Sequence, residues 1–138
     1  RDLLVKVLPY HPFLVKPNNY ELGEIFGVKL STREEVVPYG KKLQEMGAQN
    51  VLISMAGEGA VLIAADGQSM GAPAPKGTLV NGVGAGDSMV AGFLTGWMEK
   101  KDYVHAFHMG IAAGSASAFS ENLATREEVL QVLQQVEQ

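Results

Sequence analysis

A loop of small residues that runs directly into an acid is the segment best suited to chemistry. Residues 83–89 read Val-Gly-Ala-Gly-Asp-Ser-Met, and an apolar stretch follows at 90–96. The pattern predicts a loop entering a helix, where unpaired backbone N–H groups and the helix dipole favour an anion such as a phosphoryl group. Gly84 and Gly86 carry no Cβ, so the backbone can approach that anion closely. Asp87 beside it could take the proton from an attacking hydroxyl.

A plainer interpretation is also open, because small residues before an acid start many ordinary helices. The longer string at 83–93 favours the chemical interpretation, since it resembles the second signature of the PfkB/ribokinase family of carbohydrate kinases. That resemblance implies that Gly84, Ala85 and Gly86 form an anion hole and that Asp87 is the catalytic base. Gly82 departs from the family pattern, which has Ser, Thr, Val or Pro there.

A second informative string, Lys-Pro-Asn-Asn-Tyr-Glu, occupies residues 16–21. Asn18 and Glu21 are spaced to share a helix face and to form a capping box. The string also resembles the family's Asn-x-x-Glu motif, which organises Mg²⁺ and its waters around nucleotide phosphates. Mg²⁺ keeps much of its water, so both interpretations can hold together. By this resemblance Asn18 and Lys16 bind ATP, and Glu21 acts on the metal through water.

Two further segments are candidates for ATP binding. Ser54 to Ala60 is a glycine turn between predicted strands, and it resembles a family turn that contacts the nucleotide. Ser54 and Gly59 match that turn, whereas Ala56 replaces its first glycine. The small residues at 110–118 predict close helix packing, but the family brings this helix against adenine. The candidates for that contact are Ala113, Gly114, Ser117 and Ser120.

The elements that must position these residues follow from periodicity and punctuation. Helices are expected at 3–8, 19–26, 32–47, 86–98, 102–119 and 125–136, and strands at 13–16, 51–55, 60–65 and 78–80, with a hairpin turn at Asp66-Gly67. The alternation predicts an α/β fold with a mostly parallel sheet covered on both faces. The resemblance implies a ribokinase-like three-layer sandwich, present here as a partial domain. Lys16, Ser54 and Asp87 each follow a predicted strand, where such sheets bind ligands.

Composition excludes several classes of protein. The chain has 138 residues, 46% hydrophobic and 19% charged, with a net charge of −4, which indicates a globular domain. No basic cluster suggests nucleic acid, and no apolar run suggests a membrane span. The absence of cysteine excludes disulfides and thiolate metal sites, so a cytoplasmic location is expected. His105 and His108 share a helix face without a third metal ligand and are expected to lie on the solvated surface.

The resemblance extends from Phe13 to about Glu128 and is strongest to the family branch that phosphorylates the 6-hydroxyl of fructose 1-phosphate, with tagatose-6-phosphate kinases as rivals. Family members are longer, so residues 1–138 are expected to be the carboxyl-terminal, nucleotide-binding half of the kinase domain. The expected partners are a small sugar phosphate and either a second copy or the amino-terminal half. The alternative is a non-catalytic nucleotide-binding fragment or interaction module, which would have no need for Asp87.

Overall fold

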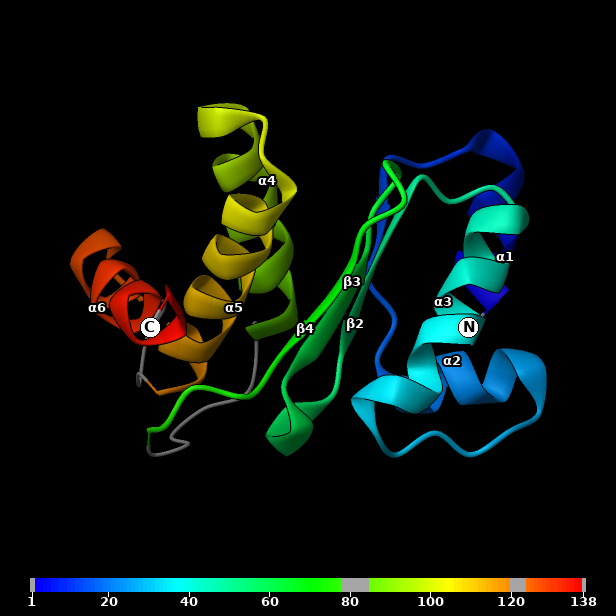
Figure 1. Ribbon diagram of the computed structural model, residues 1–138, viewed down its shortest axis with the longest axis horizontal. Helices are drawn as coiled ribbons and strands as arrows, with labels where there is room; N and C mark the ends of the chain where they lie inside the picture. Colours follow the sequence, from blue (N-terminus) through cyan, green and yellow to red (C-terminus); the bar gives the residue numbers. More distant parts are fainter. Residues whose placement is uncertain (1, 78–84, 120–123, 138) are drawn as a thin grey trace. The chain divides into compact units, whose positions relative to one another are not determined.

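The computed structural model describes residues 2–77, 85–119 and 124–137. The chain forms two compact units, Arg1–Pro73 and Ala74–Gln138. The first unit contains a four-stranded sheet with helices α1 to α3, and the second contains helices α4 to α6 (Figure 1). No helix in the described ranges is long and apolar enough to cross a membrane.

The sheet of the first unit is mixed. Its strands, in the order β1-β2-β3-β4, are Leu14–Val15, Asn50–Ser54, Ala60–Ile63 and Ser69–Ala72. β1 and β2 are parallel, whereas β2 pairs with β3 and β3 with β4 in antiparallel fashion. The expectation of a mostly parallel sheet is therefore wrong for these strands. The reason is that short turns join β2 to β3 and β3 to β4, and such turns produce antiparallel hairpins.

Helices α1 (Asp2–Val7), α2 (Asn19–Phe26) and α3 (Arg33–Glu45) lie on one face of this sheet, with a short 3-10 turn at Leu8–Tyr10 (Figure 1). α3 contacts both β2 and β3. Gly40 allows this close approach, because a Cβ there would lie 2.7 Å from Ile63 Cγ1. The core between the helices and the sheet includes Leu8, Leu22, Val36, Leu43, Val51, Ile53, Val61 and Ile63.

The second unit is built on an antiparallel pair of helices, α4 (Ala85–Lys100) and α5 (Tyr103–Ala118). Glycines on both helices face the partner. A Cβ at Gly92 of α4 would lie 2.6 Å from the carbonyl oxygen of Met109, and one at Gly110 of α5 would lie 3.1 Å from that of Met89. The two backbones are therefore closer than larger side chains would allow.

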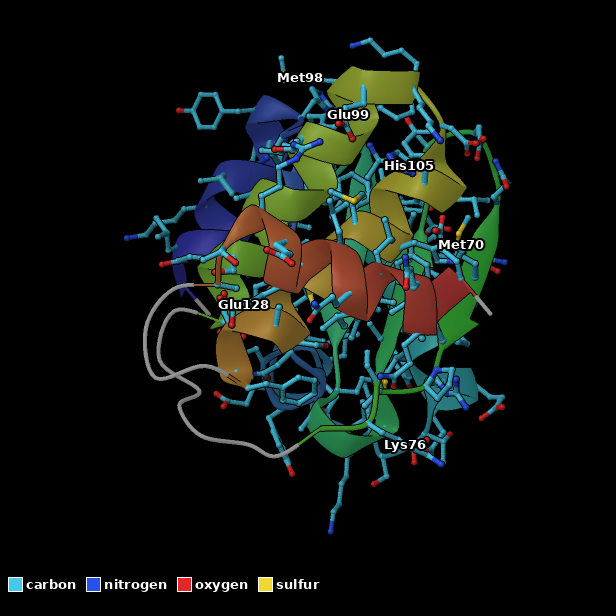
Figure 2. All side chains as sticks on the ribbon, turned by 90° about the vertical axis from the view of Figure 1, so that its left-hand side faces the viewer. Met70, Lys76, Met98, Glu99, His105 and Glu128 are labelled. Atoms are coloured by element: carbon cyan, nitrogen blue, oxygen red, sulfur yellow. The ribbon has the colours of Figure 1, made fainter. Side chains whose placement is uncertain are left out.

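The second unit is also stabilised by the packing of α6 on α5 and by contacts at the α4–α5 turn. α6 (Arg126–Glu137) packs on α5 through Met109, Ala112, Val129, Val132 and Leu133. At the α4–α5 turn the rings of Trp97 and Tyr103 stack with centroids 4.3 Å apart. Glu99 Oε1 lies 3.1 Å from His105 Nε2 at the same end (Figure 2). His105 thus joins two helices, and its side chain is only 11% exposed, so the expectation of a solvated surface position is wrong for this residue.

Most predicted elements are confirmed with small changes at their ends. α2 has the predicted bounds, with Asn18 as its N-cap and Gly27 as its left-handed C-cap. The α-helix at the start ends before Pro9, but a 3-10 turn continues through that residue. β4 was not predicted as a strand, although the hairpin turn before it was. The strand expected at 78–80 lies outside the described residues.

Candidate functional site

The predicted ATP-binding residues of the first unit meet at the carboxyl ends of β1 and β2. Lys16 directly follows β1, and Ser54 is the last residue of β2. Because these strands are parallel, the two residues lie at the same edge of the sheet. Ser54 N donates to Pro17 O at 3.1 Å, and Asn18 forms a parallel bridge with Ser54. The structure therefore brings these two candidate strings together, as the sequence predicts.

Asn18 and Glu21 form the predicted capping box at the start of α2. Asn18 Oδ1 accepts from Glu21 N at 2.8 Å, and Asn18 N donates to Glu21 Oε1 at 2.9 Å. These bonds fix both side chains at the edge of the sheet where Lys16 and Ser54 lie. The box uses Oε1 of Glu21 and leaves the second carboxylate oxygen outside it. An oxygen held in this way fits Mg²⁺, a cation that binds oxygen and keeps several of its waters.

The turn after Ser54 holds two residues in unusual backbone conformations. Gly59 has φ 103° and ψ −127°, a region that essentially only glycine occupies. Ala56 has φ 47°, in the left-handed region that glycine also favours. The turn is closed by Gly59 N donating to Ala56 O at 3.1 Å and by Met55 N donating to Gly59 O at 2.9 Å. The glycine that the family has in place of Ala56 would suit this conformation.

Asp87 lies in the first turn of α4 and is exposed to solvent. Ala85 and Gly86 precede it in the same turn, where backbone N–H groups have no partner within the helix. The prediction of a helix that carries the acid in its first turn is thus confirmed. Gly84 and the rest of the predicted anion loop lie outside the described residues. An exposed carboxylate at a helix start can meet an incoming hydroxyl from solvent.

The candidates on α5 face α4. A Cβ at Gly114 would lie 3.1 Å from Ala85 O, and one at Gly92 would lie 2.6 Å from the Ala113 Cβ. Ser117 is buried, and its Oγ donates to Ser88 Oγ at 2.8 Å. The close helix packing that the sequence suggests is therefore confirmed for these three residues. Ser120 lies outside the described residues.

Ser88 was missed as a residue of interest in the sequence. Its contact is with Ser117, 29 residues away, so no local pattern could reveal it. The only signal is a hydroxyl residue directly after the candidate acid, on the face of α4 where small residues recur. No group of three or more His, Cys, Asp or Glu side chains that could hold a metal occurs within the described part of the chain.

Comparison with known proteins places these residues in a family. The model of the pfkB family carbohydrate kinases matches residues 1–130. The chain belongs to the pfkB family of carbohydrate kinases. It is 52% identical to the 1-phosphofructokinase of Bacillus subtilis over 98% of its own length and 44% of that protein. It is 36% identical to a D-tagatose-1-phosphate kinase of Bacillus licheniformis, with the same coverage of 98% and 44%.

A solved structure supports the fold of this pfkB chain. A Staphylococcus aureus protein described as a candidate phosphofructokinase superimposes with a TM-score of 0.92 at 39% identity, over 98% of this chain and 44% of that one. The fold is therefore the ribokinase-like α/β fold, as expected, and the chain contains part of that domain. It spans less than half the length of the curated relatives it matches.

Proposed function

We propose that the protein containing this chain is an ATP-dependent kinase that phosphorylates fructose 1-phosphate to fructose 1,6-bisphosphate. The observation that carries the proposal is the exposed carboxylate of Asp87 in the first turn of α4. This pfkB chain is 52% identical to a 1-phosphofructokinase, and a carboxylate at this position is well placed to act as the general base of such a kinase. Residues 1–138 then form the carboxyl-terminal, nucleotide-binding half of the kinase domain.

The proposed step is an in-line transfer of the γ-phosphoryl group. The 6-hydroxyl oxygen of the sugar attacks the γ-phosphorus, and Asp87 accepts the hydroxyl proton. A new O–P bond forms, the bond between the γ-phosphorus and its bridging oxygen breaks, and ADP leaves. The proposed anion hole consists of the backbone N–H groups of Gly84, Ala85 and Gly86, which stabilise charge on the group in transit, and the positive end of α4 adds to this effect.

The nucleotide is proposed to bind at the edge of the sheet. Lys16 contributes a positive point charge for the phosphates, and Asn18, Ser54 and Gly59 complete the nucleotide-binding surface at this edge of the sheet. Mg²⁺ neutralises phosphate charge when bound, and Glu21 holds its waters through the carboxylate. The hydrogen bonds that fix Asn18, Ser54 and Glu21 support this assignment, because residues that are already held in place lose little conformational freedom when the nucleotide binds. The family resemblance assigns Ala113, Gly114, Ser117 and Ser120 to the adenine side.

A second sugar phosphate is favoured by one relative. The 36% identity to a D-tagatose-1-phosphate kinase makes tagatose 1-phosphate the main alternative substrate, in place of the tagatose 6-phosphate suggested by the sequence. Tagatose and fructose differ only in configuration at one carbon. Assays that compare the two 1-phosphates in parallel therefore separate these kinases by kcat/KM.

Association with further protein is also proposed. The chain spans 44% of the length of its relatives, so the sugar is proposed to bind largely through residues beyond this chain. The second unit exposes large apolar side chains, with Met98 at 74%, Leu130 at 40% and Leu94 at 38% exposure. Met98 is labelled in Figure 2. Such surface favours contact with an amino-terminal half or with a second copy. Sedimentation velocity of the complete gene product measures its oligomeric state and so tests association with a second copy.

The experiment is an ADP-release assay on the complete gene product with ATP, Mg²⁺ and fructose 1-phosphate. Asp87→Asn should lower turnover by about 10²–10⁴-fold, the range for loss of a general base, while ATP binding persists. Asp102→Asn is the matched control, because Asp102 caps α5 and Asn caps a helix equally well. Near-normal turnover in Asp87→Asn would refute the base. ATP binding without turnover of either sugar would favour a non-catalytic nucleotide-binding module.

A further inference from the structure

We propose that the hydroxyl pair Ser88–Ser117 sets the rotation of α4 and thereby aims the Asp87 carboxylate. Ser88 and Ser117 are positioning residues in this account, which rests on the proposed function of Asp87. For Ser117 this role replaces the adenine contact that family resemblance assigns to it.

The pair connects two distant helix ends. Ser117 Oγ donates to Ser88 Oγ at 2.8 Å, across 29 residues of sequence. Ser88 follows Asp87 in the first turn of α4, and Ser117 lies in the last turn of α5. Ser117 is only 5% exposed and Ser88 is half-buried, and both line a groove of about 530 Å³. Loss of either hydroxyl removes the hydrogen bond between them.

The directional contacts between α4 and α5 at their connecting turn, Glu99–His105 and Trp97–Tyr103, lie at the opposite end of the pair from Asp87. Toward the end that carries Asp87, the close contacts given by the glycines involve glycine, alanine and methionine, including the approach of Gly114 to Ala85 O and of Gly92 to Met109 O. Such contacts are not directional, whereas a hydrogen bond weakens as its angle departs from linear. Successive residues of a helix project about 100° apart. Tying Ser88 to α5 therefore directs the neighbouring Asp87 away from that interface, in agreement with its exposure.

Catalysis is sensitive to such an anchor. A misplacement of about 1 Å can cost about 10²-fold in rate. Ser88→Ala and Ser117→Ala should each lower kcat about 10-fold in the complete gene product, with the KM for ATP unchanged. The double variant should be no slower than either single variant, because both remove one hydrogen bond. Ser88→Thr should restore kcat, since it keeps a hydroxyl, and the groove of about 530 Å³ beside Ser88 has room for the added methyl.

Ser115→Ala is the matched control, because it removes a hydroxyl from the same helix at a half-buried position. Its kcat should equal that of the wild type. An increase in the KM for ATP with unchanged kcat in Ser117→Ala would instead assign Ser117 to the nucleotide and overturn the proposal. Equal losses in Ser115→Ala, or no rescue by Ser88→Thr, would also overturn it. Wild-type protein without turnover is a different outcome, because it refutes the proposed kinase itself.

A second measurement distinguishes a change in the orientation of Asp87 from unfolding of the α4–α5 pair. Amide hydrogen exchange of Met89 and Val90, the first N–H groups that bond within α4, reports opening of its first turn. Ser117→Ala should speed exchange there while leaving α6 and the first unit unchanged. A general rise in exchange across α4 and α5 would show that the variant unfolds the helix pair, and this result would overturn a specific positioning role.

Discussion

Asp87 differs from three glutamates in the first turns of other helices. Glu21, Glu35 and Glu128 each accept a hydrogen bond from the backbone N–H of the capping residue. The residue three positions before Asp87 is Gly84, and glycine has no side chain with which to form a capping box. Asp87 is therefore not required for a box of this kind. Its carboxylate is available for the proposed transfer of a proton.

The turn at Ala56–Gly59 provides a prediction at the same scale. Gly59→Ala should lower the free energy of unfolding by about 1–3 kcal/mol, because alanine is strained at φ 103°. Ala56→Gly should change stability by less than about 1 kcal/mol, since relief of left-handed strain offsets the greater freedom of glycine when unfolded. Urea unfolding of both variants measures this. A Gly59→Ala variant as stable as the wild type would contradict the assigned conformation.

The two capping boxes of the first unit form a matched pair at the scale of elements. Asn18→Ala and Thr32→Ala each remove a cap and should each cost about 1 kcal/mol of stability. Only Asn18→Ala should also raise the KM for ATP and the Mg²⁺ concentration needed for half-maximal rate. The comparison needs unfolding and steady-state kinetics on the same samples. Equal kinetic effects from both variants would remove Asn18 from the proposed nucleotide site.

The box that begins α3 also predicts a pH dependence. Backbone N–H groups of Ser31 and Thr32 donate to Glu35 and lower its pKa below the ordinary value of 4.5. A lowered pKa in the folded state adds stability above the unfolded pKa, and that stability is lost as the pH falls through the folded pKa. The stability difference between wild type and Glu35→Gln should therefore shrink below pH 4.5. A difference that does not vary with pH would contradict this assignment.

The contact between α4 and α5 should be intolerant of side chains at its glycines. Gly92→Ala places a Cβ 2.6 Å from Met109 O and from the Ala113 Cβ, so the helices must separate. Overpacking of this kind costs about 1–3 kcal/mol. Gly57→Ala is the control, because its Cβ would meet nothing within 4 Å. Thermal unfolding compares the two, and an equal effect of both substitutions would show that the helices are not so close.

Across the whole molecule, the sequence predicts local structure well and long-range pairing poorly. Asn18 and Gly27 delimit α2 by their own chemistry, so its ends could be predicted. β4 contains Ser69, Met70, Gly71 and Ala72, which have no strong preference for a strand, and it forms through pairing with β3. The antiparallel part of the sheet follows from short turns that the sequence does show, so the expectation of a mostly parallel sheet gave those turns too little weight. The Ser88–Ser117 contact depends on a partner that no local pattern identifies.

The family and its proposed chemistry could be inferred because they depend on short strings. Residues 16–21 and 83–93 carry the resemblance, and the family match over residues 1–130 agrees with it. The meeting of Lys16, Asn18 and Ser54 was also predictable, since parallel strands end at one edge of a sheet. The sugar substrate was harder to predict from the sequence, because the chain covers only 44% of the length of its relatives.

Identification of the product tests the central claim most directly. The complete gene product is incubated with ATP, Mg²⁺ and fructose 1-phosphate, and phosphorus NMR follows the reaction. We expect ADP and fructose 1,6-bisphosphate to appear in equal amounts, with a new phosphate ester on the 6-oxygen and a rate at least about 10²-fold lower in Asp87→Asn. ADP with inorganic phosphate in place of the bisphosphate, or formation of the bisphosphate by Asp87→Asn at the wild-type rate, would contradict this account.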